Sequence, residues 1–73
     1  MIDLLEPELL RSFVAIAETG GFTAAAQRVH RTQSAVSMQI RRLEEQLGAE
    51  LFLREGRTVR LSHGGELLLP HAR

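Results

Sequence analysis

Residues 32–48 read TQSAVSMQIRRLEEQLG, and this segment predicts one continuous helix. Its apolar side chains recur every three or four positions, the period of a single helix face, at Val36, Ile40, Leu43 and Leu47. Thr32 is a residue type that caps helix N-termini, and Gly48 is one that ends helices. The pattern therefore predicts a helix over Gln33–Leu47, about 22 Å long at about 1.5 Å per residue.

The remaining side of this helix is polar at its start and basic further along. Amide and hydroxyl side chains come first, arginines follow, and acidic residues are confined to the last turns. The major groove of duplex DNA presents donors, acceptors and flanking phosphates to a helix that enters it N-terminus first. We interpret the segment as a DNA-recognition helix; the alternative is a solvated polar helix face.

Length and composition exclude several classes of protein. The 73 residues make one small domain, and a hydrophobic content of 44% favours a compact helical core over disorder. There is no cysteine and the three histidines are scattered, so no metal site is expected. No catalytic constellation or phosphate loop is present, so we expect neither an enzyme nor a cofactor. Without a membrane-span or signal pattern, the expected compartment is the cytoplasm.

The net charge is zero, but the charges are unevenly distributed. Residues 28–43 contain four arginines and no acidic residue, and residues 54–63 contain three arginines and one glutamate. Two basic blocks in an otherwise acidic chain are typical of a domain that contacts nucleic acid through two elements.

Two shorter helices are predicted before the long one. Pro7 suits a first helical position, and a glycine pair at residues 20–21 ends that helix. Its apolar face is expected at Leu10, Phe13, Val14 and Ala17. After a buried Phe22, Thr23 can cap a second helix over residues 24–30. A turn at residues 30–32 would then complete a helix-turn-helix at about residues 21–42.

The residues after Gly48 predict a β-hairpin followed by a helix. Two short strands, at residues 49–54 and at the alternating residues 57–61, flank a turn at Glu55-Gly56, with Leu51, Phe52, Val59 and Leu61 available to face the helices. Ser62 can cap a last helix, in which Pro70 should cause a kink or remove a backbone hydrogen bond.

Together these elements predict a mainly α fold of the winged helix-turn-helix class. It has a three-helix core, a two-stranded β-hairpin wing at about residues 51–61 and the start of a linker helix. We assign residues 1–61 to the DNA-binding domain, with residues 1–6 as a loose lead-in, and residues 62–73 to the linker.

Motifs along most of the chain carry a family resemblance. They are LRSF at residues 10–13, GGFTAAA at 20–26, TQSAVS at 32–37, QI at 39–40, LE at 43–44, LG at 47–48, LF at 51–52, Arg54, Arg57 and LS at 61–62. In this order and without gaps, the chain resembles the N-terminal DNA-binding domain of LysR-type transcriptional regulators. Met38 departs from the family, where many members have arginine or another polar residue. Methionine can touch only a thymine methyl group, so base preferences of other members do not transfer.

The resemblance implies sequence-specific binding of double-stranded DNA for bacterial transcription regulation. It implies a homodimer or tetramer that pairs through a long linker helix, of which residues 62–73 look like the start. A small-molecule effector would bind a C-terminal domain that is absent here. The alternative function is a winged-helix protein-interaction module without specific DNA reading, which the zero net charge and the leucines at residues 67–69 would fit.

The expected DNA contacts lie in the recognition helix and the wing: Thr32, Gln33, Ser34, Ser37, Met38, Arg41, Arg42, Arg54 and Arg57. Gln33 could read an adenine edge, and the serines could bond phosphate or base. Arg41 and Arg42 suit phosphates, although Glu45 could pair with one of them. Arg57 suits the minor groove or its phosphates, with a salt bridge to Glu55 as the alternative.

A tenth candidate, Arg31 in the turn, could face either phosphate or solvent.

Overall fold

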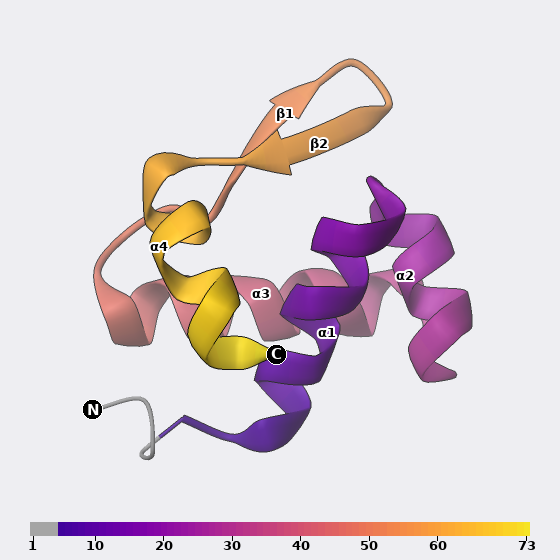
Figure 1. The fold of residues 1–73 in the computed structure, drawn as a ribbon. Helices are drawn as coiled ribbons and strands as arrows, with labels where there is room; N and C mark the ends of the chain where they lie inside the picture. The colour runs from indigo at the N-terminus through magenta and orange to yellow at the C-terminus, as the bar shows by residue number, and fades with distance from the viewer. Residues whose placement is uncertain (1–4) are drawn as a thin grey trace.

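Helices packed around α1 carry a β-hairpin at one end (Figure 1). The computed structural model describes residues 5–73. Its elements in chain order are α1 (Pro7–Thr19), α2 (Phe22–Val29), α3 (Gln33–Leu47), β1 (Phe52–Glu55), β2 (Thr58–Leu61) and α4 (His63–Ala72). The winged helix-turn-helix class predicted from the sequence is confirmed, with α2 and α3 as the helix-turn-helix and the hairpin as the wing.

The ends of the long helix lie where the sequence predicts them. The Thr32 hydroxyl accepts a hydrogen bond from the backbone N–H of Ala35 at 3.0 Å, and Gly48 ends α3 with a φ of 69°. The hydroxyl of Ser62 caps α4 in the same way, accepting from the N–H of Gly65 at 3.1 Å. Both caps satisfy backbone donors that have no partner within their own helix.

The start of α2 differs from the prediction. The helix begins at Phe22 rather than Ala24, and its N-cap is Gly21 in an extended conformation. Thr23 therefore does not cap the helix; its hydroxyl donates to the side-chain oxygen of Gln33 at 3.3 Å. The Phe22 ring is buried, as expected. Because this burial fixes Phe22 in the first turn of α2, the helix begins two residues earlier than capping by the Thr23 hydroxyl would give.

The buried face of α1 is also displaced from the predicted one. Its buried apolar side chains are Leu9, Phe13, Ala15 and Ile16, whereas three predicted positions are only half-buried: Leu10, Val14 and Ala17. The reason is that α1 contacts three helices, α2, α3 and α4, so its apolar surface is wider than one stripe. A single periodic ladder cannot identify the centre of such a surface.

The expected lead-in at residues 1–6 lies partly outside the described residues. Of the two residues that the structure describes, Leu5 is buried in the core and Glu6 is the N-cap position of α1. The prediction of a loose segment is therefore wrong for these two residues.

All three phenylalanines of the chain meet in the core. The rings of Phe13 and Phe52 lie 5.3 Å apart, and those of Phe22 and Phe52 lie 6.2 Å apart in an edge-on arrangement. Such tilted aromatic pairs are favourable beyond the area that they bury. Because Phe13 is in α1, Phe22 in α2 and Phe52 in β1, the cluster joins the wing to the helices.

The wing is an antiparallel hairpin whose register runs from Phe52 opposite Leu61 to Glu55 opposite Thr58. The predicted turn at Glu55-Gly56 is wrong by one residue, since Glu55 belongs to β1 and the two residues between the strands are Gly56 and Arg57. Gly56 has a φ of 62°, a backbone region that glycine adopts readily, so the glycine begins the two-residue turn.

Three elements meet at Leu51, just before the wing. The carboxylate of Glu44 in α3 accepts a hydrogen bond from the backbone N–H of Leu51 at 2.8 Å. The carbonyl of Leu51 accepts from the N–H of Ser62 at 3.0 Å, and the Ser62 hydroxyl donates to the carbonyl of Glu50 at 2.6 Å. The Glu44 side chain is half-buried rather than fully exposed to solvent. These bonds fix the wing relative to α3 and α4.

The last helix, α4, lies against α1 and β2 and continues through Pro70 to Ala72. Within residues 5–73, no helix is both long enough and apolar enough to cross a lipid bilayer.

Candidate nucleic-acid interface

The first half of α3 presents its polar side chains to solvent. Thr32, Gln33 and Ser34 are exposed, Ser37 is half-buried and Met38 is 71% exposed. The opposite side of α3 is buried in the core at Val36, Ile40 and Leu43. The amide and hydroxyl groups that the sequence assigns to DNA reading therefore lie on the surface, where a groove edge could reach them.

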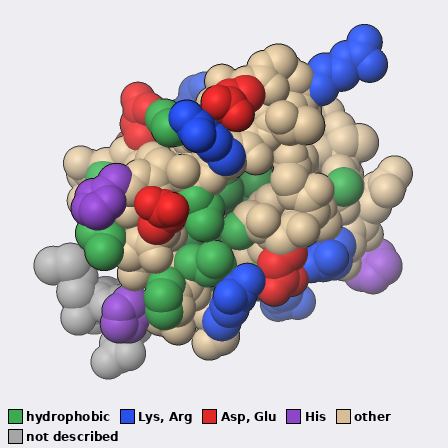
Figure 2. Space-filling view, turned by 45° about the horizontal axis from the view of Figure 1, so that its top comes forward, with side chains coloured by type: hydrophobic (Ala, Val, Ile, Leu, Met, Phe, Trp, Pro, Cys, Tyr) green, Lys and Arg blue, Asp and Glu red, His purple; other side chains and the backbone are tan. Residues whose placement is uncertain are grey.

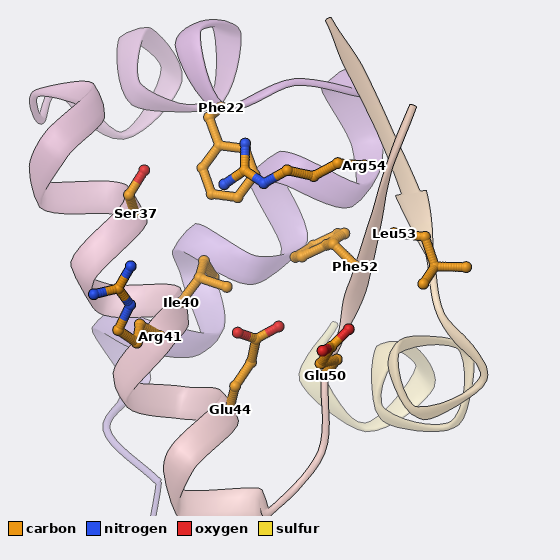
Figure 3. Close-up of a pocket in the computed structure, with 9 residues that line it drawn as sticks. All are labelled: Phe22, Ser37, Ile40, Arg41, Glu44, Glu50, Phe52, Leu53 and Arg54. Carbon is orange, nitrogen blue, oxygen red and sulfur yellow. The ribbon is translucent and has the colours of Figure 1, made fainter. Parts of the chain in front are cut away.

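A groove of about 450 Å³ separates α3 from β1 (Figure 3). Ser37 and Arg41 line it from α3, and Arg54 lines it from β1. Glu44 and Glu50 lie at one end of the groove, away from Arg54. The structure thus brings together a hydroxyl and an arginine of the recognition helix with an arginine of the wing, although they are far apart in sequence.

A second hollow of about 540 Å³ continues from the first, because Phe22 and Arg54 line both. It extends to Gln33 at the start of α3 and to Arg57 in the wing turn. Five side chains both line these hollows and belong to the predicted DNA contacts. We call them the helix–wing surface: Gln33, Ser37, Arg41, Arg54 and Arg57. One arginine of the first basic block, Arg41, and two of the second, Arg54 and Arg57, lie at this surface.

Most arginines outside this surface are paired with glutamates. Five ion pairs join residues within 5–73: Arg28–Glu18 at 2.6 Å, Arg31–Glu8 at 3.0 Å, Arg42–Glu6 at 3.4 Å, Arg60–Glu55 at 3.2 Å and Arg73–Glu18 at 3.7 Å. Figure 2 shows neighbouring arginine and glutamate side chains on one face of the molecule. Arg41, Arg54 and Arg57 form no ion pair with any residue from 5 to 73. Three of the four arginines without an ion pair within residues 5–73 therefore lie on the helix–wing surface, the fourth being Arg11 on α1.

Arg42 points to another side of α3. Its guanidinium pairs with Glu6 beside the start of α1, not with Glu45, which was the expected partner. Both side chains of the pair are more than half exposed, so the pair contributes little to stability and a phosphate could replace the carboxylate. Arg42 remains a predicted phosphate contact at the margin of the surface.

Alternatives were also considered for two further arginines. Arg31 pairs with Glu8, and about half of its side chain is exposed to solvent. Glu55, the alternative partner of Arg57, pairs with Arg60 instead. This leaves Arg57 at the tip of the wing without a partner among the described residues.

Sequence reasoning missed one contact in the site. The guanidinium carbon of Arg54 lies 4.6 Å from the centroid of the Phe22 ring. Successive side chains of a strand alternate between its faces, so Phe52 and Arg54 share one face of β1, and Figure 3 shows both pointing towards the helices. The i, i+2 spacing of Phe52 and Arg54 could have indicated this face, but nothing local identifies Phe22 as the partner.

Comparison with known proteins places this geometry in a family. Residues 7–66 match a family model described as "Bacterial regulatory helix-turn-helix protein, lysR family". The chain is 57% identical over 68 residues to the HTH-type transcriptional regulator DgdR of Burkholderia cepacia, covering 93% of this chain and 23% of DgdR. It is 48% identical over 68 residues to the regulator HdfR of Yersinia enterocolitica, with the same coverage of both chains. The chain spans less than half the length of such curated relatives.

Solved structures with the same fold include complexes with DNA. The DBD of CbnR in a DNA complex superimposes with a TM-score of 0.89 at 38% identity, over 93% of this chain and 78% of that one. The DBD of BenM with benA site 1 DNA gives a TM-score of 0.86 at 39% identity, over 92% of this chain and 75% of that one. The similarity in fold and sequence to these structures therefore extends well beyond the helix-turn-helix itself.

Proposed function

This chain belongs to the lysR family of bacterial regulatory helix-turn-helix proteins, and from that premise we propose that it binds double-stranded DNA sequence-specifically as part of a transcription regulator. The observation that carries the proposal is the helix–wing surface. On it, three of the four arginines that form no ion pair within residues 5–73 lie beside the exposed start of α3. Its charge suits phosphates, and its amide and hydroxyl groups suit base edges.

In this proposal α3 enters the major groove with its N-terminus first. Gln33 can pair with an adenine edge through both its amide groups, and Ser34 and Ser37 can bond a base or a phosphate. Exposed Met38 contributes apolar contact to a thymine methyl group. The Thr32 hydroxyl already caps α3, so we assign it mainly to holding the helix start that faces the base pairs.

The arginines contact the DNA backbone on either side of that helix. Arg41 lies one turn further along α3 than Ser37, and both line the hollow between α3 and β1. In the proposed complex, α3 leaves the major groove of the DNA at Arg41. Arg54 and Arg57 reach the duplex from the wing, at the phosphates or in the adjacent minor groove. Two elements that contact the backbone in different places fix the orientation of the recognition helix.

For the complete protein we propose a homodimer or tetramer that binds a dyad-symmetric operator. Two recognition helices would then enter major grooves about one helical turn apart. The aligned segment covers only 23% of DgdR and of HdfR, which leaves room in such regulators for an effector-binding domain and a linker helix that continues α4. Because bacterial DNA lies in the cytoplasm, we place the protein there, and binding of this kind needs no catalytic step.

Selection of bound duplexes from a random pool tests the proposal. We expect the selected duplexes to share a half-site motif, and single changes within it to lower the affinity roughly 5- to 150-fold. The affinity should also fall steeply as salt is added, because phosphate contacts release counterions. A pool that yields no shared motif, or an affinity indifferent to salt, contradicts sequence-specific DNA binding and favours a protein-interaction module.

A further inference from the structure

We propose that Phe22 is a positioning residue for DNA binding, because its ring holds the Arg54 guanidinium where the two hollows of the helix–wing surface meet. The guanidinium lies over the ring at 4.6 Å from its centroid, and both residues line both hollows. Figure 3 shows Arg54 reaching from β1 across to Phe22 on α2. The inference rests on the proposed function, since it explains how one of its arginines is directed.

The ring is itself held firmly. Phe22 is 8% exposed, and its ring packs edge-on against Phe52, which packs against the fully buried Phe13. A chain of three aromatic rings thus runs from the core to the guanidinium. An arginine that rests on this support moves with the body of the domain rather than with the hairpin alone.

Stacking leaves the donors of Arg54 available. A guanidinium that lies over a ring uses its face for the cation–π contact, while its N–H groups point outward in its own plane. Within residues 5–73, Arg54 forms no ion pair and donates no hydrogen bond. Arg60, on the neighbouring strand, is instead paired with Glu55 and is not among the residues that line the two hollows.

The physical benefit is preorganisation. A free arginine side chain samples many rotamers, and fixing it on a phosphate opposes binding by the entropy that is lost. Because Arg54 packs on the Phe22 ring, its side chain loses much of this rotamer freedom already when the domain folds. The affinity for duplex should therefore depend on the aromatic character of residue 22 even though its ring has no hydrogen-bonding group to offer the DNA.

A double-mutant cycle between Phe22→Leu and Arg54→Gln tests this, with duplex affinity measured by fluorescence anisotropy. Phe22→Leu keeps an apolar side chain but removes the ring, and we expect it to weaken binding about 3- to 10-fold. In the Arg54→Gln background the same change should cost less than about 2-fold, because the guanidinium is already gone. Phe22→Tyr keeps a ring and should bind like the parent chain.

Thermal unfolding of each variant separates this role from a purely structural one. A structural role lowers the unfolding temperature and weakens binding equally in both backgrounds, and that additive result overturns the inference. Parent-like binding by Phe22→Leu overturns it as well. Should Phe22→Leu unfold, Phe22→Met takes its place in the cycle. If the parent chain itself fails to bind duplex, the proposed function fails; if it binds and the cycle is additive, only the role of Phe22 fails.

Discussion

Replacing Arg41, Arg54 and Arg57 together by glutamine is expected to lower the affinity for duplex DNA on the order of 10²–10³-fold at about 0.1 M salt. Each phosphate contact releases close to one counterion, and the three losses multiply. The slope of log affinity against log salt should become shallower by about three. All three side chains are exposed and form no ion pair within residues 5–73, so folding should be little affected. Fluorescence anisotropy across a salt series measures both quantities.

Arg11 provides the matched control. It too is exposed and has no ion pair with residues 5–73, but it lies on α1 in a different hollow, with Leu10 and Val14. Arg11→Gln should change the affinity less than about 3-fold. The helix–wing surface is not the DNA-binding face if the triple variant binds within about 3-fold of the parent chain. The same conclusion follows if Arg11→Gln lowers the duplex affinity as much as each replaced arginine of the triple variant does.

Gly65→Ala should destabilise the fold by about 2–3 kcal/mol, as overpacking of a close contact does. A Cβ atom at residue 65 would lie 2.3 Å from the carbonyl oxygen of Leu51 and 2.8 Å from Cδ2 of Leu61. The carbonyl is backbone held by the Ser62 N–H, so α4 must move away from the wing. For a domain of this size the loss should lower the unfolding temperature by roughly 10–20 °C, measured by circular dichroism.

Gly21→Ser is the comparison for that variant. It adds a larger side chain at a glycine, but nothing lies within 4 Å of a Cβ atom there. Residue 21 is also the N-cap of α2, a position that serine favours. Its stability should stay within about 1 kcal/mol of the parent chain. Equal losses in Gly21→Ser and Gly65→Ala would show that the tight approach of α4 to Leu51 is not what constrains residue 65.

Most helix ends that depend on local chemistry could be predicted from the sequence, although the cap expected at Thr23 is absent. Thr32, Gly48 and Ser62 act within a few residues of themselves, and their caps and stops are where the local pattern puts them. The apolar period of α3 also gave its buried face correctly, because that helix packs on one side. Where α1 packs on several neighbours, the same rule misplaced the face, since the centre of the buried surface depends on how distant helices pack.

The charged groups show the other limit. Ion pairing between Arg42 and Glu6, or Arg31 and Glu8, depends on how α1 lies across the helix-turn-helix, which no local window contains. Sequence spacing suggested Glu45 and Glu55 as partners because they are close along the chain. The same limitation hid Glu44 as an acceptor for the Leu51 N–H. The candidate site residues could be proposed from the sequence, but which arginines remain without a partner required the folded arrangement.

The central claim is that the start of α3 and the wing form one DNA-binding face. Titrating the isotopically labelled chain with a duplex of about two helical turns, and following the backbone amide resonances, tests it most directly. We predict that the largest shifts fall at residues 32–42 and 53–58, with small shifts around Arg11 on α1 and along the exposed side of α4. Shifts concentrated on α1 or α4, with residues 32–38 and the wing unchanged, would contradict the account.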